Sequence, residues 1–280
     1  TTYISSVIDN GAGDYMDIVS VHPYVYDNIF NHKPEKIVDD INTLKNTLSQ
    51  KNCVKPIWVT ELNWPTNDSQ CGYTETEQAE YLVRAMLALQ GEKSVEKIFV
   101  YTAADNDTGN ADTEKVFGIF KSANYTTANA AKLSYVALSQ FANATYGMNA
   151  EGVVNLGNNV KAYSYSNGKN SITAIWSTGS TTTIDWNVSD SVKVYDIYGN
   201  LMYASSNNGV AQITLGSAPV YVVNYINGDL TEDNVINLLD LVRIKKNFSN
   251  SIFVDTMDIT KDYKVDSYDM VELIKQILNK

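Results

Sequence analysis

A twelve-residue pattern that occurs twice near the end of the chain constrains its folding more than any other feature. Asp229-Leu-Thr-Glu-Asp-Asn-Val-Ile-Asn-Leu-Leu-Asp240 aligns with Asp258-Ile-Thr-Lys-Asp-Tyr-Lys-Val-Asp-Ser-Tyr-Asp269, and the offset is 258 − 229 = 29 residues throughout. Oxygen-bearing side chains recur at loop positions 1, 3, 5, 9 and 12, and position 7 can supply a backbone carbonyl. A hard cation such as calcium takes about six to eight oxygen ligands from a loop of this kind. The repeat therefore predicts two calcium-binding loops.

Each loop continues into an apolar-periodic helix, marked by Leu241, Val242 and Ile244 in the first repeat and by Met270, Val271, Leu273 and Ile274 in the second. This duplicated unit, with Asp rather than Glu at position 12, resembles a type I dockerin over essentially all of residues 227–280. The resemblance implies a small α-helical module with paired EF-hand-like loops. It assigns one calcium ion to Asp229, Thr231, Asp233, Asn237 and Asp240, and the other to Asp258, Thr260, Asp262, Asp266 and Asp269.

The sixth position of each loop departs from the usual glycine, which a left-handed turn favours there. It is Asn234 in the first loop and Tyr263 in the second. Because Asn tolerates that conformation and Tyr does so poorly, we expect the second site to be weaker or distorted. A calcium sensor is disfavoured, since sensor loops normally end in a bidentate Glu and their helices open a Met-rich groove.

The dockerin resemblance also implies a protein partner, the cohesin domain of a scaffold. Loop positions 10 and 11 usually face that partner, and here they are Leu238-Leu239 and Ser267-Tyr268. Three basic side chains on the following helices belong to the same expected surface: Lys245, Lys246 and Lys275. Because the two pairs differ chemically, one binding orientation is expected to dominate.

The formal net charge of -11 and the isoelectric point near 4.6 oppose binding to nucleic acid or to an anionic membrane. No apolar stretch approaches the ~20 residues of a membrane span. Cys53 and Cys71 flank the apolar run Pro56–Val59, whose extended form would separate them beyond a disulfide's reach of roughly 7 Å between Cα atoms. Free thiols are therefore expected.

From residue 17 to about 146, short apolar runs alternate with amphipathic stretches, as in successive β/α units of a parallel sheet. The expected strands are 17–22, 56–61 and 97–101, and the expected helices follow Pro34, begin at the Thr74-Glu-Thr-Glu77 capping box, and span about 131–141. Residues 149–226 change to Val, Ile, Thr and Tyr alternation with turn pairs at Asn167-Gly168 and Gly199-Asn200, which predicts an antiparallel β-sandwich.

Polar side chains cluster where the three expected parallel strands end, and in a β/α barrel this edge forms the active site. The segments are Asp17-Ile-Val-Ser-Val-His-Pro-Tyr24, Trp58-Val-Thr-Glu-Leu-Asn-Trp64, and Phe99-Val-Tyr101 with Asp105-Asn-Asp107 and Phe117-Gly118-Ile119. They resemble strands six, seven and eight of clan A glycoside hydrolases, and family 39 enzymes in particular. Taken alone, each strand-end carboxylate is more often an ion-paired or solvated group.

The clan A resemblance implies that Glu61 is the nucleophile of a retaining mechanism, which forms a covalent glycosyl-enzyme intermediate. It gives His22 and Tyr24 the role of orienting that carboxylate, and Trp64 a stacking contact with the sugar. Tyr101 and Asp105 complete the expected substrate-binding set. For His22 and Tyr24 the competing interpretation is a satisfied polar lining of the barrel, and for Asp105 a helix cap or solvated loop.

The retaining mechanism also needs a second carboxylate roughly 5 Å from the nucleophile, and in this clan it belongs to an Asn-Glu pair that ends strand four. No Asn-Glu dipeptide occurs in these 280 residues. Since only three of eight β/α units are present, we expect a chain truncated at its N-terminus and catalytically silent on its own, with a poorly stable partial barrel.

The fold class is therefore a multidomain chain: a partial (β/α) TIM barrel at 1–148, an accessory antiparallel β-sandwich at 149–226 and a dockerin at 227–280. The leading hypothesis is a secreted, cellulosomal glycoside hydrolase fragment that acts on plant cell-wall polysaccharide and binds a cohesin scaffold through calcium. The alternative is a non-catalytic anchoring or carbohydrate-binding protein in which Glu61 is a relic. The sequence does not specify the glycan.

Overall fold

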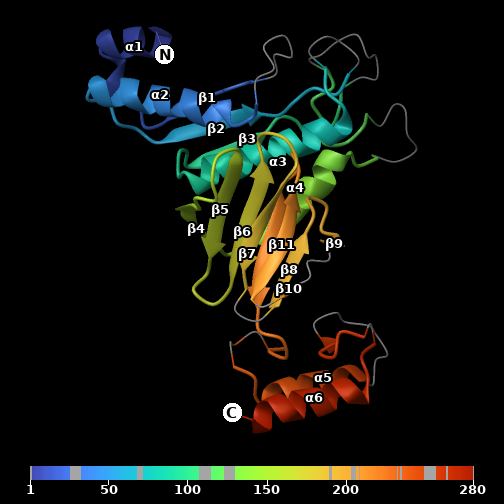
Figure 1. The fold of residues 1–280 in the computed structure, drawn as a ribbon. Helices are drawn as coiled ribbons and strands as arrows, with labels where there is room; N and C mark the ends of the chain where they lie inside the picture. Colours follow the sequence, from blue (N-terminus) through green and yellow to red (C-terminus); the bar gives the residue numbers. More distant parts are fainter. Residues whose placement is uncertain are drawn as a thin grey trace.

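The computed structural model describes residues 2–25, 33–67, 72–106, 115–122, 130–188, 191–202, 206–207, 209–231, 233, 235–248, 257–262 and 264–279. Figure 1 shows three parts in chain order: a parallel sheet with helices, a pair of antiparallel sheets below it, and a helix pair at the C-terminal end. Cys53 is a free, buried thiol, as predicted, and Cys71 lies outside the described residues. None of the described helices has the length and apolar character that a membrane span requires.

The first part contains three strands that pair in parallel in the order β1-β2-β3. The strands are β1 (Val19–Val21), β2 (Ile57–Leu62) and β3 (Lys97–Val100), and they are separated by α2 (Lys36–Gln50) and α3 (Glu75–Gly91). Three further elements are α1 (Thr2–Asp9), the 3-10 helix η1 (Ala12–Tyr15) and α4 (Leu133–Thr145). Neither α1 nor η1 was predicted, because both lie before the first recognisable apolar run.

Two of the three predicted helices agree with the expectation from the sequence. Thr74 and Glu77 form the expected capping box at the start of α3, and the side chains of Ile37, Ile41, Leu44 and Leu48 form the buried face of α2. Helix α4 differs, because Leu133 and Val136 are each 38% exposed. Its buried face consists of the smaller Ser134 and Ala137, together with Phe141 and Ala144.

The second part consists of two antiparallel sheets. One has six strands in the order β4-β5-β6-β12-β8-β9, and the other has three in the order β10-β11-β7. The bounds are β4 (Asn149–Val153), β5 (Val160–Ser166), β6 (Ser171–Ser177), β7 (Thr182–Asn187), β8 (Ser191–Tyr195), β9 (Leu201–Met202), β10 (Ser206–Asn207), β11 (Val210–Leu215) and β12 (Val220–Tyr225). A compact apolar cluster lies between the sheets, with Ala162, Ile175 and Val222 from the larger sheet and Ile213 and Leu215 from the smaller.

The parallel sheet and the antiparallel sheets share one hydrophobic core. A single cluster of buried residues runs from Val59 and Leu82 to Tyr163, Trp176 and Tyr221. Helix α3 lies between the two sheet systems in Figure 1. Gly91, at the end of α3, is needed for this close approach, since a Cβ there would lie 2.1 Å from Cδ1 of Tyr163. Residues 1–145 and the sheets below them therefore pack as one body.

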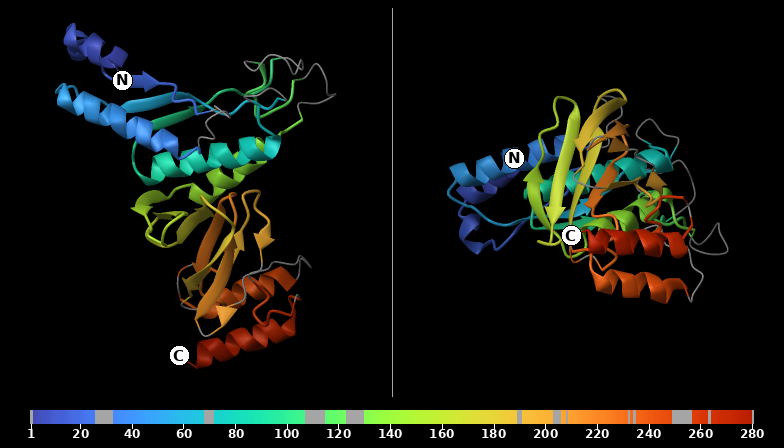
Figure 2. Two further views of the ribbon diagram at one scale, coloured as in Figure 1. Left: turned by 45° about the horizontal axis from the view of Figure 1, so that its top comes forward. Right: turned by 60° about the horizontal axis from the view of Figure 1, so that its bottom comes forward.

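The third part is a pair of helices, α5 (Leu238–Phe248) and α6 (Ser267–Leu278), which lie side by side in Figure 2. Their core is separate from the others and is formed by Leu230, Ile236, Ile244, Met257, Ile259 and Leu273. One polar contact links this part to the larger sheet, since Lys261 Nζ donates to Ser191 Oγ at 3.3 Å. Asn234 and Tyr263, at position six of the loops, lie outside the described residues.

Buried tyrosines at the junction of the first two parts make the free energy of unfolding decrease at alkaline pH. Burial raises the pKa of Tyr163, Tyr165 and Tyr221, and the Glu92 carboxylate raises that of Tyr163 further. The unfolded chain releases these phenolic protons near pH ~10, whereas the folded chain retains them. The stabilisation is therefore complete below that pH and is lost as the pH rises above it.

We expect the free energy of urea unfolding to fall between pH 10 and 11.5 by roughly 1.4 kcal/mol per pH unit for each such tyrosine. The buried Lys132, whose pKa burial lowers, contributes little to this slope, because above its ordinary pKa of about 10.4 it is neutral in both the folded and the unfolded chain. Tyr165→Phe should reduce this alkaline slope, and Tyr146→Phe, at a residue that is 88% exposed, should leave it unchanged. Equal slopes in the Tyr165→Phe variant and the unaltered chain would contradict the assignment.

Candidate functional site

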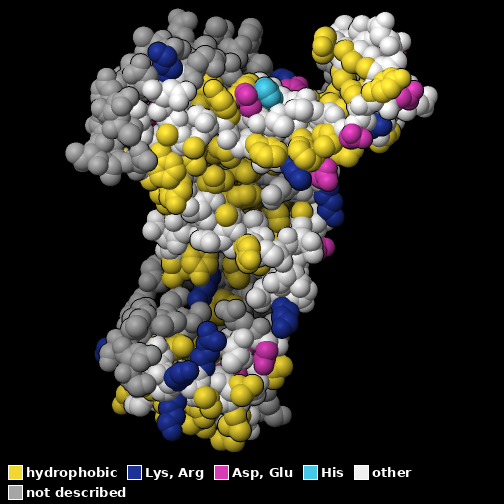
Figure 3. Space-filling view, turned by 180° about the vertical axis from the view of Figure 1, so that it is seen from behind, with side chains coloured by type: hydrophobic (Ala, Val, Ile, Leu, Met, Phe, Trp, Pro, Cys, Tyr) yellow, Lys and Arg dark blue, Asp and Glu magenta, His cyan; other side chains and the backbone are white. Residues whose placement is uncertain are grey.

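Glu61 lies at the carboxyl end of β2, at the edge where the parallel strands β1 and β2 end together. Its Oε2 accepts a hydrogen bond of 2.8 Å from the Tyr24 hydroxyl, and Nδ1 of His22 lies 3.3 Å from the same oxygen. The side chains of His22 and Glu61 are 47% and 32% exposed, so a ligand can approach them. Figure 3 shows a histidine side chain at this surface beside an acidic one.

An irregularity in β2 determines the direction of Glu61. The pairing of β2 with β3 shifts between Val59 and Leu62, so three steps on β2 oppose two on β3. With regular alternation, residue 61 would share the buried face of Ile57 and Val59; instead, Leu62 takes that place and is fully buried. Bulges of this kind re-aim side chains next to active sites. The carboxylate of Glu61 is thereby kept out of the core.

Further aromatic rings lie beside the Tyr24 side chain that contacts Glu61. The Phe117 ring centroid lies 5.7 Å from that of Tyr24 and 5.7 Å from that of Tyr101. The His22 and Tyr24 rings meet edge to face at 6.5 Å. The structure thus brings His22 and Tyr24 to Glu61, and Tyr101 lies against Phe117 on the far side of the Tyr24 contact. Phe117 had no predicted role, because a phenylalanine that is buried in the structure cannot be distinguished from a core residue in the sequence.

The prediction that Trp64 stacks on a sugar is wrong for this structure. Trp64 is fully buried, and its indole Nε1 donates a hydrogen bond of 2.8 Å to the backbone carbonyl of Val25. The preceding Asn63 is also buried and donates to the carbonyl of Phe117. Trp64 therefore supports the segment that carries Tyr24 from beneath and offers no ring face to solvent.

Asp105 is held in an internal ion pair, which contradicts its predicted role in substrate binding. Its Oδ1 accepts hydrogen bonds of 2.8 Å from Lys132 Nζ and from the amide of Gly118. The two charged side chains are only 10% and 2% exposed. Burial lowers the pKa of Lys132, and the hydrogen bond to Asp105 opposes that shift. Asp107 lies outside the described residues.

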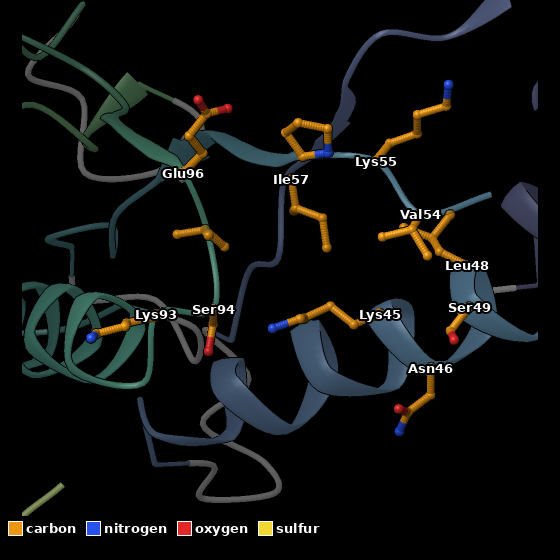
Figure 4. A pocket seen from close by; sticks show the side chains of 12 residues that line it. Lys45, Asn46, Leu48, Ser49, Val54, Lys55, Ile57, Lys93, Ser94 and Glu96 are labelled. Carbon is orange, nitrogen blue, oxygen red and sulfur yellow. The ribbon is translucent and has the colours of Figure 1, made fainter. Parts of the chain in front are cut away.

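A cavity of about 510 Å³ lies at the other end of the strands, between α2, the start of β2 and the α3–β3 connection. Figure 4 shows that Lys45 of α2 points toward Ser94 across it, whereas Lys55 points away. Residues at this amino-terminal end of parallel strands usually contribute to stability rather than to chemistry. Glu61 is at the opposite end of β2, so this cavity is not part of its site.

The two predicted calcium loops fold around their last carboxylate. Asp240 is fully buried, and its two oxygens accept hydrogen bonds from the amides of Leu230, Thr231 and Asn237 at 2.8 Å and from the Thr231 hydroxyl at 3.0 Å. Asp269 has the same relation to the second loop, with the Thr260 amide at 2.9 Å, the Thr260 hydroxyl at 3.0 Å and the Asp266 amide at 2.8 Å. These described donors are neutral.

The remaining predicted ligands lie in the same loops. Asp229 and Asp258 each accept from the amide four residues later, that of Asp233 and Asp262 respectively. In the described part of the chain, no three acidic, His or Cys side chains form a closed group. The donor set nevertheless fits calcium in its chemistry, since every predicted side-chain ligand offers oxygen.

The predicted partner-binding residues lie on the exposed side of the helix pair. Leu238, Leu239 and Tyr268 are 66%, 60% and 70% exposed. Further exposed apolar side chains extend the same surface, namely Val242, Val271, Ile274 and Leu278. Lys and Arg side chains gather among apolar ones on this part of the molecule in Figure 3. Exposed apolar patches of this kind mark protein contacts.

Comparison with known proteins places two families on this chain. Residues 2–127 match the glycosyl hydrolase catalytic core, and residues 227–278 match the dockerin type I domain. No curated protein matches the chain.

Solved structures share the fold at low sequence identity. A family 39 glycoside hydrolase from the gut symbiont Bacteroides cellulosilyticus WH2 has a TM-score of 0.64 and 20% identity, over 80% of this chain and 47% of that one. A glucosidase from Croceicoccus marinus has a TM-score of 0.55 and 12% identity, over 79% and 57%. AbfB, a family 51 alpha-L-arabinofuranosidase from Bifidobacterium longum, has a TM-score of 0.52 and 13% identity, over 78% and 55%.

The chain therefore spans about half the length of these solved structures, and at such identities the likeness concerns the fold. The parallel β/α arrangement and the two family matches agree with the resemblance to clan A enzymes and to dockerins. The chain thus combines a segment that matches the glycosyl hydrolase catalytic core with a segment that matches the dockerin type I domain.

Proposed function

We propose that residues 1–148 are the C-terminal part of a (β/α)8 barrel in a retaining glycoside hydrolase, and that Glu61 is its nucleophile. The observation that carries this proposal is the position of Glu61 at the carboxyl edge of parallel strands, with the Tyr24 hydroxyl donating to it. Residues at that edge perform the chemistry in barrel enzymes. Residues 149–226 would then be an accessory β-sandwich that supports the barrel.

The two carboxylate oxygens of Glu61 would have different roles. Tyr24 and His22 both approach Oε2, which leaves Oε1 to attack the anomeric carbon. In the retaining mechanism the new bond joins this oxygen to carbon while the bond to the leaving oxygen breaks. The leaving oxygen takes a proton from a second carboxylate, and water later releases the sugar with its original configuration. That second carboxylate would belong to a barrel strand other than β1, β2 and β3.

Tyr24 would act as a positioning and stabilising donor for the nucleophile. A hydrogen bond to the charged form of a carboxylate favours ionisation, which attack on carbon requires. The fixed phenol also restricts rotation of the carboxylate about its side-chain torsion. His22 supports the same oxygen from the other side of β1's end. Tyr101 closes the aromatic wall through Phe117 and is available for contact with a sugar ring.

The dockerin would attach this hydrolase to a cohesin of an extracellular scaffold, as in a cellulosome. Calcium, when bound, would be held by Asp229, Thr231, Asp233, Asn237 and Asp240 at one site and by Asp258, Thr260, Asp262, Asp266 and Asp269 at the other, and it would offset the charge of their carboxylates. The exposed pair Leu238-Leu239, with Lys245 and Lys246, would form one contact surface, and Ser267-Tyr268 with Lys275 the other. The substrate would be a plant polysaccharide or its oligosaccharides.

The nucleophile is tested by covalent trapping with an activated aryl glycoside, whose leaving group needs no protonation. In a form of the protein that contains a complete barrel, we expect an adduct on the peptide containing Glu61. Tyr24→Phe should slow its formation roughly tenfold to hundredfold, because one fixed donor is lost. Tyr146→Phe is the matched control and should have no effect, since Tyr146 is 88% exposed at the end of α4. An adduct that persists in Glu61→Ala would reject the assignment.

This chain by itself should release no aryl alcohol from the same glycoside, because its described parallel sheet has three strands and cannot enclose a sugar as a complete barrel does. Measured turnover by the purified chain, above that of Glu61→Ala, would refute the proposal of a partial barrel. A complete-barrel form without adduct or turnover would instead favour the non-catalytic anchoring protein.

The calcium loops are tested by calorimetry and circular dichroism on the whole chain, before and after chelation. Calcium should increase helix content, since metal binding and folding are coupled in such loops. Two sites of unequal affinity are expected, the weaker in the second repeat. Asp229→Ala should remove one binding event and Asp258→Ala the other, whereas Asp40→Asn, on α2, should leave both. Two equally tight sites would contradict the predicted inequality, and a flat titration would contradict both sites.

A further inference from the structure

Glu35 is a charged residue that the proposed mechanism does not use, and it lies in the interior where α2, α3 and β6 meet. Its side chain is only 12% exposed. Arg84 of α3 donates to both oxygens, from Nε to Oε1 and from Nη2 to Oε2, each at 2.7 Å. The indole Nε1 of Trp176, on β6 of the larger antiparallel sheet, donates to Oε1 at 2.7 Å. A buried carboxylate requires such donors, because losing one leaves charge uncompensated.

Arg84 connects this junction to the edge that carries Glu61. The Arg84 guanidinium carbon lies 5.4 Å from the centroid of the Tyr81 ring. The Tyr81 ring in turn meets the Trp64 ring edge to face, with 5.8 Å between centroids. A cation on one side and an aromatic edge on the other fix the plane of Tyr81.

Trp64 completes the connection. Its indole N–H donates to the carbonyl of Val25, and the adjacent residue, Tyr24, donates to Glu61. Trp64 and Arg84 are almost fully buried, so neither can shift without moving its neighbours. Each link is a direct contact, and the series runs from the accessory sheet to the carboxylate.

We propose that Trp176 is a positioning residue for Glu61, acting through the Glu35–Arg84 ion pair and the Tyr81–Trp64 ring contact on the Tyr24 segment. The proposal rests on the proposed function only where it names Glu61 as the nucleophile. The accessory sheet would thereby do more than cover α3. The Trp176 indole of this sheet begins the series of contacts that orients the Glu61 carboxylate. Coupling of this kind travels through contiguous packed groups and has to be measured.

The four tryptophans of the chain provide the measurement. Each indole N–H has its own acceptor: Glu96 for Trp58, the Val25 carbonyl for Trp64, Glu35 for Trp176 and Asn224 for Trp186. With ¹⁵N-labelled tryptophan, the whole 280-residue chain gives four indole signals, assigned by single Trp→Phe substitutions. Exchange of each N–H with D₂O then reports opening at one place in the structure.

Trp176→Phe keeps an aromatic ring in the core and removes the donor to Glu35. We expect exchange of the Trp64 indole to accelerate at least about tenfold. Exchange at Trp58 and Trp186 should remain unchanged. Trp186→Phe is the matched control, because it removes an indole donor from a half-buried position on the neighbouring sheet, and it should not affect Trp64.

An unchanged Trp64 rate in Trp176→Phe would overturn the proposal, as would equal acceleration of all remaining indoles, which indicates general destabilisation. If Trp176→Phe does not fold, Arg84→Lys is used, since it keeps the charge and loses the paired donors. It should accelerate Trp64 and Trp176 and spare Trp58 and Trp186; a uniform change would again overturn the proposal. The readout is independent of chemistry, so absence of a Glu61 adduct would reject the nucleophile and leave this result standing.

Discussion

The all-round burial of α3 is the constraint on which the first two parts of the structure depend. Apolar and small side chains cover the whole circumference of this helix, including Leu82, Val83, Leu87 and Leu89, and even Arg84 and Gln78 are buried. Such a helix is stable only when other elements cover every side of it. The parallel sheet, the helices α2 and α4, and the strands β4 and β5 provide that cover. The accessory sheets are therefore a structural requirement of the β/α segment, which has an incomplete sheet and cannot enclose α3 alone.

A small irregularity in the pairing of β2 with β3 determines that the Glu61 carboxylate faces solvent. Regular alternation along β2 would place the Glu61 carboxylate among the apolar side chains that face the helices, where an isolated charge is strongly unfavourable. The shift in pairing between Val59 and Leu62 resolves that conflict. It buries leucine in place of glutamate, and it presents the carboxylate to the phenol and imidazole at the end of β1. Local geometry and electrostatics thus favour the same arrangement.

The sequence predicted features that repeat or follow a strict period and missed those that depend on distant packing. The loop-helix duplication, the parallel strands and the Thr74 capping box are confirmed. Each of them is recognisable from a pattern of residue types along a short stretch of the chain. The contact between the Tyr24 hydroxyl and the Glu61 carboxylate was expected only from the resemblance to clan A enzymes. Trp64 and Asp105 were wrongly expected to face substrate, since burial by Val25, Gly118 and Lys132 involves residues up to 39 positions away. The Glu35–Trp176 contact spans 141 positions and has no local signal.

The separate core of the helix pair has a consequence for stability. The apolar cluster around Ile244 and Leu273 shares no member with the cluster that joins the barrel segment to the sheets. In the described residues, the stretch after β12 and the Lys261–Ser191 hydrogen bond connect the helix pair to the sheets. Because the two cores are separate, the helix pair can lose its fold without exposing the core around α3, and the support of Glu61 is insulated from events at the calcium loops.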